Sequence, residues 1–140
     1  MVDGLVVVDT DLVIDYLRRA EPGASLVRRL LRSQSLRITA VTAFELRLGA
    51  DFFQRAEAIG ALLATATLPL DLMGALQAGE IFEGLAKTGR GIGMRDALIA
   101  GICLRFGLPL ATRNRRHFER VEGLDFVSGW PPDGSRDSAS

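Results

Sequence analysis

Short apolar runs alternate along this chain with segments of helical spacing, and that alternation restricts the fold more than any other feature. The run at residues 5–8 is β-branched and is typical of a strand buried on both faces. Residues 36–39, 67–70 and 108–112 are further strand candidates, and residues 125–127 are a candidate edge strand. Strands that alternate with helices are typical of α/β folds. We therefore predict an α/β domain with a mainly parallel sheet of four to five strands.

Helical patterns fill the intervals between these strands, and polar residues are available to cap them. Thr10 or Asp11 is predicted to cap the first helix, Thr42 a later one, and Asp71 a long one. Glu45 follows Thr42 with the spacing of a capping box. The remaining predicted helices begin near Pro22, Glu57, Asp96 and Arg115.

Composition narrows the class of protein. The chain of 140 residues is 48% hydrophobic and has 17 basic and 17 acidic residues, so it can bury a core but has no global positive field for nucleic acid. The single cysteine, Cys103, excludes an internal disulfide. The acidic start and the short longest apolar run predict a cytoplasmic protein without a membrane span. We expect a domain over residues 1–128, with residues 129–140, Trp130 included, as a disordered polar tail.

Three acidic residues and one amide lie where predicted elements begin or end. Asp9 and Asn114 follow the first and fourth strands directly, and Glu45 and Asp96 lie near helix starts. Ligands of such folds bind at the carboxyl ends of the strands, so we expect these four side chains to converge. Two carboxylates ~4 Å apart repel by about 1 kcal/mol in water and by more in a cleft, and Mg²⁺ or Mn²⁺ relieves that repulsion. The pattern predicts metal-dependent phosphoryl transfer.

Each of these acids also has a structural interpretation. Asp9 could cap a helix, Glu45 could complete a capping box, and Asp96 could stabilise a helix N-terminus. Zinc chemistry is disfavoured because His117 is the chain's only histidine. Arginines are abundant beside the fourth strand, and Arg113 and others there are candidate phosphate ligands or a solvated face.

Four segments resemble, in order, the motifs of the PIN-domain ribonucleases, and most closely the VapC-type toxins of type II toxin–antitoxin systems. The segments are residues 7–17, 42–50, 96–101 and 111–124, and the resemblance extends over residues 5–127. It implies a PIN-like three-layer α/β/α sandwich and a Mg²⁺- or Mn²⁺-dependent endoribonuclease. It also implies a homodimer, a cognate antitoxin protein that inserts a peptide into the active groove, and an RNA substrate such as a tRNA or rRNA.

The resemblance assigns roles to individual residues. Asp9, Glu45 and Asp96 would form the acidic site, with Asp9 and Asp96 as the closest metal ligands. Asn114 would complete the catalytic group at a position that is often Asp, which favours one metal over two. The implied substrate-binding residues are Thr10, Thr112, Arg113 and Arg116.

Two other functions stay open on the sequence. Asn114 leaves room for a PIN-like scaffold or RNA-binding protein that has lost cleavage. Asp9, Thr10 and Asp11 after a strand imitate the nucleophile motif of haloacid dehalogenase-type phosphatases. That chemistry also requires a placed lysine and a late acidic pair, whereas the one lysine is Lys87 and no Asp-Asp pair occurs.

Overall fold

A parallel sheet lies at the centre of the molecule. The computed structural model describes residues 4–128, 130 and 131. Its strands are β1 (Val6–Val8), β2 (Leu36–Thr39), β3 (Thr67–Leu68) and β4 (Leu110–Ala111), in the order β3-β2-β1-β4. Val7 is in register with Arg37 of β2 and with Leu110 of β4, and every strand pair is parallel. The predicted α/β class with a mainly parallel sheet is confirmed.

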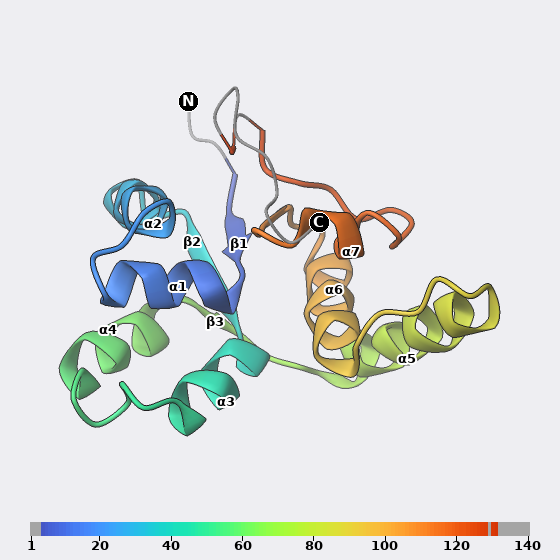
Figure 1. The fold of residues 1–140 in the computed structure, drawn as a ribbon, viewed down its shortest axis with the longest axis horizontal. Coiled ribbons are helices and arrows are strands. Elements are labelled where there is room, and N and C mark those ends of the chain that lie inside the picture. The colour runs from blue at the N-terminus through green and yellow to red at the C-terminus, as the bar shows by residue number, and fades with distance from the viewer. Residues whose placement is uncertain (1–3, 129, 132–140) are drawn as a thin grey trace.

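Helices cover both faces of the sheet. They are α1 (Thr10–Leu17), α2 (Gly23–Arg32), α3 (Ala40–Leu48), α4 (Ala56–Ala66), α5 (Leu72–Lys87), α6 (Met94–Phe106) and α7 (Arg115–Phe118). In Figure 1, α1, α2 and α4 lie on one side of the strands, and α5, α6 and α7 lie on the other. This arrangement is the expected three-layer α/β/α sandwich.

The pleat of β1 divides the core in two. Val6 and Val8 belong to a cluster that includes Leu12 of α1 and Val27 of α2, whereas Val7 belongs to a cluster with Ile99 of α6. Successive strand residues point to opposite faces, so a run of three fully apolar residues supplies both cores. The buried thiol of Cys103 lies in the second cluster.

Two strands are shorter than predicted, and the fifth is not formed. β3 ends at Leu68 and β4 starts at Leu110, although runs over residues 67–70 and 108–112 were expected. Residues 125–127 make only one isolated bridge to β4, from Phe126. The bridge is held by backbone bonds of Leu110 N to Asp125 O (2.9 Å) and of Val127 N to Leu110 O (3.1 Å). A single bridge satisfies those groups without a regular strand.

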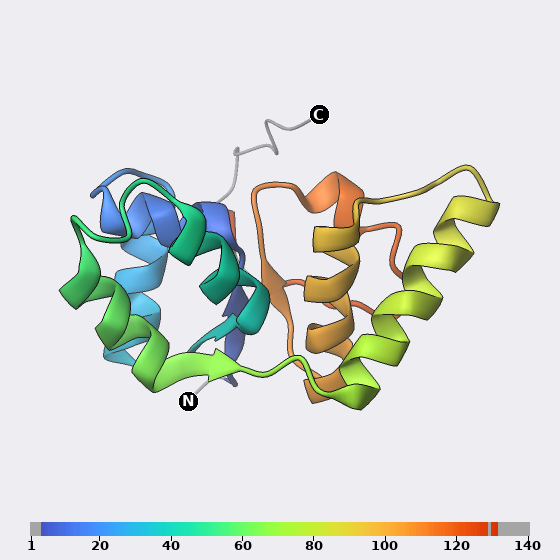
Figure 2. The same ribbon diagram turned by 90° about the horizontal axis from the view of Figure 1, so that it is seen from below.

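The N-terminal half of helix α5 packs against α6, and the C-terminal end of α5 diverges from it (Figure 2). Asp71 caps α5 as predicted, since its Oδ1 accepts a bond from Gly74 N at 2.9 Å. Gly74 and Ala78 of α5 face Gly101 of α6, where a Cβ built on Gly101 would lie 2.7 Å from both Gly74 O and Ala78 Cβ. The small residues therefore set how closely the two helices approach, and α6 carries the acidic residue Asp96.

The packed part of the chain extends past residue 128. Trp130, which the sequence pattern assigned to the tail, is 8% exposed and belongs to the first core cluster. That assignment was wrong because a lone indole among polar residues can still bury its apolar surface against a nearby core. The rest of the expected tail, residues 132–140, lies outside the described residues. Among the helices that the structure describes, none has the length and apolar character needed to cross a bilayer.

Candidate active site

The candidate site lies at the carboxyl ends of β1, β2 and β4. The chain runs from β1 to β2 and β3 on one side and returns to β4 on the other, so the strand order reverses beside β1. Ligands of open parallel sheets bind at such a reversal. Asp9 follows β1, Thr112 follows β4, and α3 begins directly after β2.

Asp9 is 2% exposed and is held from several directions. Its Oδ1 accepts the N–H of Thr10 at 2.8 Å, and its Oδ2 accepts the hydroxyl of Thr112 at 2.7 Å. Asp9 is the N-cap of α1, so the prediction of Thr10 or Asp11 as the cap was wrong. The same carboxylate of Asp9 therefore caps α1 and forms part of the acidic site.

Glu45 reaches the site from the second turn of α3. The N-cap is Thr39, whose Oγ1 accepts the N–H of Thr42 at 3.2 Å, so Thr42 is not the cap and Glu45 is not a capping-box residue. The prediction failed because β2 passes into α3 with no intervening loop, and one threonine ends the strand and caps the helix. Thr10 donates its hydroxyl to Glu45 Oε1 and is 2.8 Å from Thr42 Oγ1. Glu45 is thus free of a capping role, and its carboxylate accepts from Thr10, the residue that follows Asp9.

Asp96 lies in the first turn of α6, where a negative charge is favourable. Burial raises the pKa of its carboxyl, as does the charge of Asp9, although the adjacent guanidinium of Arg95 opposes the shift. Such a buried acid requires a counter-charge to stay ionised. The three predicted acids do converge.

Arg95 occupies the centre of the three carboxylates, and the sequence analysis gave it no role. Its Nη2 donates to Asp9 Oδ1 at 2.7 Å, its Nε to Glu45 Oε2 at 2.5 Å, and its Nη1 to Asp96 Oδ1 at 2.5 Å. Burial alone would lower the pKa of Arg95, but the charges and hydrogen bonds of Asp9 and Glu45 raise it above its ordinary value. The position of Arg95 beside Asp96 was the available signal, because a cluster of acids requires a cation and the sequence offered one there.

Asn114 stands at the rim of the acidic group. Its N–H donates to Thr112 Oγ1 at 2.9 Å, and its amide Nδ2 donates to His117 Nδ1 at 2.8 Å. His117 Nδ1 is in turn 3.9 Å from Asp96 Oδ2. Within the described residues, the buried Asn114 Oδ1 has no hydrogen-bond partner. A carbonyl oxygen of this kind can accept from a water or ligate a hard cation.

The two arginines predicted to bind substrate differ in their surroundings. Arg113 is tied to α1, where it lies 3.3 Å from Asp15 Oδ2 and donates to the carbonyl of Asp11 at 3.4 Å. Arg116 is exposed on α7. The contacts of Arg113 therefore lie with α1 rather than with the three acids.

The oxygen ligands of the site are of the type that a hard cation prefers, but they are not spaced to coordinate one ion together. Carboxylate and amide oxygens are the ligands that Mg²⁺ and Mn²⁺ prefer. Mg²⁺ binds its ligands at about 2.0–2.1 Å, whereas here each carboxylate sits on a different nitrogen of one wide guanidinium. Accordingly, in the described part of the chain no three acidic, histidine or cysteine side chains are grouped as direct ligands of one ion.

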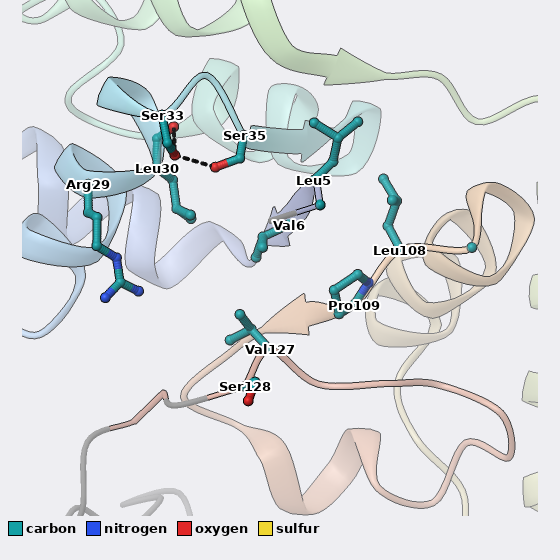
Figure 3. Close-up of a pocket in the computed structure, with 12 residues that line it drawn as sticks. Leu5, Val6, Arg29, Leu30, Ser33, Ser35, Leu108, Pro109, Val127 and Ser128 are labelled. Carbon is teal, nitrogen blue, oxygen red and sulfur yellow. Dashed lines mark hydrogen bonds between the residues drawn. The ribbon is translucent and has the colours of Figure 1, made fainter. Parts of the chain in front are cut away.

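A separate pocket of about 610 Å³ lies at the opposite end of the strands (Figure 3). Its lining is mainly apolar, with Val6, Leu108, Pro109 and Val127 beside Ser33 and Ser35. None of the predicted site residues lines it, so it is distinct from the acidic group.

Comparisons with known proteins agree with this geometry. The model of the PIN domain matches residues 6–124. The chain is 33% identical over 121 residues to the tRNA(fMet)-specific endonuclease VapC of Shigella flexneri, covering 83% of this chain and 91% of that protein. It is 30% identical over 141 residues to VapC ribonuclease Y4jK of Sinorhizobium fredii, covering 91% of this chain and 99% of the relative.

A solved structure gives the same result in three dimensions. The DNA-bound VapBC structure from Salmonella typhimurium superposes with a TM-score of 0.76 at 26% identity, covering 89% of this chain and 98% of the other. The family match supports a PIN domain and not a phosphatase, and the side chain of Lys87 pairs with Glu83 at 3.9 Å on α5. The order of the motifs, the parallel sandwich and the converging acids all have one explanation: the chain belongs to the PIN-domain family and lies among its VapC proteins.

Proposed function

We propose that this protein is a divalent-metal-dependent endoribonuclease and the toxin of a toxin–antitoxin pair. The observation that carries the proposal is the convergence of Asp9, Glu45 and Asp96 on a single cationic group. Carboxylates from three distant segments can converge only around a positive counter-charge. In a phosphodiester-cleaving site a divalent cation supplies that charge. The relatives named as VapC ribonucleases support the same activity.

Asp9, Asp96 and Glu45 would hold Mg²⁺ or Mn²⁺, with Asn114 Oδ1 as a neutral fourth oxygen. When bound, the metal would lower the pKa of a water and stabilise negative charge on the phosphate. Asn114 supplies no charge, so the site as a whole is less negative than one with four acids. That difference favours one bound metal before RNA arrives.

The chain's own residues would orient the reacting groups. Thr112 fixes Asp9 through Oδ2, and Thr10 fixes Glu45 through Oε1, so neither carboxylate must be ordered when RNA binds. The exposed Arg116 would contact backbone phosphates of the RNA. Arg113 would do so by exchanging its contact with Asp15 for an RNA phosphate.

The substrate and the partner follow from the relatives. The name of the Shigella protein makes tRNA(fMet) the first RNA to test. The Salmonella structure contains VapBC, which supports a cognate antitoxin as the protein that this chain binds.

Cleavage assays with matched carboxylate variants test the proposal. Purified protein is incubated with bulk tRNA in Mn²⁺, Mg²⁺ or EDTA, and the 5′ ends of the products are mapped. Asp9→Asn and Asp96→Asn should each lower the cleavage rate by on the order of 10² or more, because each removes a charged metal ligand. Asp11→Asn is the control, since that carboxylate is exposed on α1.

The same assay separates the remaining alternative. Asn114, which the sequence resemblance puts at a position that is often Asp, keeps open the alternative of a scaffold that binds RNA without cutting it. Tight RNA binding by the wild type with no cleavage in either metal would favour the scaffold. Equal cleavage by the wild type and Asp9→Asn would overturn the proposed site.

A further inference from the structure

Arg95 uses all three nitrogen positions of its guanidinium on the three acids of the site. Nε, Nη1 and Nη2 each donate to a different carboxylate, at 2.5–2.7 Å. A salt bridge on the surface usually joins one cation to one acid and contributes little. Here one planar cation joins β1, α3 and α6, which makes it the internal counter-ion of the site.

The surroundings of Arg95 permit it to leave. Its side chain is 35% exposed, whereas that of Asp9 is 3% exposed and that of Asp96 is 11% exposed. Asp9 and Asp96 are therefore the deeply buried partners, whereas Glu45, at 27% exposed, and Arg95 lie nearer the solvent. A long side chain of this kind can turn outward without moving the backbone of α6.

A divalent cation and the guanidinium of Arg95 compete for the same three carboxylates. Asp9 Oδ1 already accepts from Thr10 N and from Arg95 Nη2, and Asp9 Oδ2 accepts from Thr112. A divalent ion placed among these oxygens would lie within ~4 Å of a positive charge, where repulsion is strong in a poorly solvated site. The carboxylates are also held apart by the width of the guanidinium.

We infer that Arg95 is a built-in competitor of the metal, which stabilises the metal-free site and must swing outward before a divalent cation can bind. The inference rests on the proposed function, since it concerns the same acidic group. Arg95 thereby lowers the apparent affinity for metal, so that half-occupancy of the site requires a higher metal concentration than the acids alone would need.

Arg95→Gln tests this by metal binding rather than by activity. Mn²⁺ affinity is measured by calorimetry for the wild type, Arg95→Gln and the matched control Arg105→Gln. Arg105 is on the same helix and pairs with Asp71 at 2.8 Å, away from the site. Arg95→Gln should bind Mn²⁺ about tenfold more tightly because a nearby positive charge is gone, and Arg105→Gln should bind as the wild type does. Without metal, Arg95→Gln should melt at a lower temperature than the wild type, and saturating Mn²⁺ should remove that difference.

The movement itself has a spectroscopic readout. The Nε–H signal of Arg95, assigned by its loss in Arg95→Gln, should shift and broaden as diamagnetic Mg²⁺ is added to the wild type. Equal or weaker Mn²⁺ binding by Arg95→Gln, or an Nε–H signal unchanged at saturating Mg²⁺, would overturn the inference. Wild-type binding that Asp9→Asn leaves intact, or no binding by any variant, would instead overturn the metal site of the proposed function, and the inference with it.

Discussion

Thr112 is the residue that most directly orients the buried carboxylate of Asp9. Its hydroxyl donates to Asp9 Oδ2 and accepts the N–H of Asn114, and the side chain is 4% exposed. One hydroxyl thus connects the end of β4 to the acid that follows β1. A buried hydroxyl with two partners is costly to remove, because both partners are left unsatisfied.

Thr112→Val should therefore lower the free energy of unfolding by about 1–3 kcal/mol and weaken Mn²⁺ binding. Valine has nearly the shape of threonine, so the loss reports the hydroxyl and not a cavity. Thr112→Ser keeps the hydroxyl and should keep the wild-type Mn²⁺ affinity, although it loses a buried methyl group. Urea denaturation and calorimetry check the two quantities. Unchanged Mn²⁺ affinity in Thr112→Val would show that Asp9 does not depend on this bond.

The sequence predicted which acidic residues converge, but not that the guanidinium of Arg95 lies between them. Asp9, Glu45 and Asp96 could be chosen because each stands at an element junction, and junctions of parallel strands share one edge. The place of Arg95 depends on its rotamer and on distances of a few ångströms across three elements. No pattern of residue spacing carries that information. The structural interpretations of Asp9 as a helix cap and of Asp96 as a first-turn acid were also correct, so each residue serves both its helix and the site.

The contact between α5 and α6 controls the placement of an element that carries part of the site. Both Arg95 and Asp96 lie in the first turn of α6, and α6 packs on α5 through Gly74, Ala78 and Gly101. Helices approach this closely only where side chains are small. A change at the contact should therefore act on stability and on the site together.

Gly101→Ala should lower the free energy of unfolding by about 1–3 kcal/mol, even though alanine favours helices. The added Cβ would lie 2.7 Å from Gly74 O and 2.9 Å from Ala78 N, which are backbone atoms that cannot rotate away. Gly79→Ala, on the open side of α5, is the matched control, because a Cβ there meets nothing within 4 Å. That variant should gain about 0.5–1 kcal/mol. Urea midpoints compare them, and a stabilised Gly101→Ala would contradict the described packing.

Elements were predicted better in type than in extent. Apolar runs identified each strand of the sheet, but β3 and β4 pair over two residues each because only those residues face a partner strand in register. The start of α3 was missed for a related reason: the pattern shows a threonine, not which of two threonines accepts the first free N–H. Both errors concern hydrogen-bond partners, which local sequence does not specify.

Among the large apolar side chains that the molecule exposes, several lie close together on α3 and on α5. Phe44 and Leu48 are one turn apart on α3, and Leu72, Met73 and Leu76 form a strip on α5. Single exposed apolar residues are ordinary, but strips at helical spacing suggest a covered surface. We propose that a second copy of this chain covers the strip on α5, in keeping with the homodimer that the sequence resemblance implied.

The double variant Leu72→Glu with Leu76→Glu should run as a single chain of 15.1 kDa in light scattering, and the wild type at twice that mass. Glutamates buried in an apolar interface would lack partners and oppose association. Ala86→Glu adds one glutamate at the other end of α5 and should leave the mass of the wild type unchanged. A wild-type protein that has the mass of a single chain at micromolar concentration would contradict the proposed homodimer.

The shielded thiol of Cys103 gives the protein an experimental advantage. Burial raises its pKa to about 12, so the sulfur stays protonated and out of reach of reagents while the fold is intact. A cysteine introduced at the mouth of the acidic group would thus be the sole reactive handle in the native state. Spin labels or fluorophores attached there could follow motions of the site in the otherwise natural sequence, with no need to delete a native residue first.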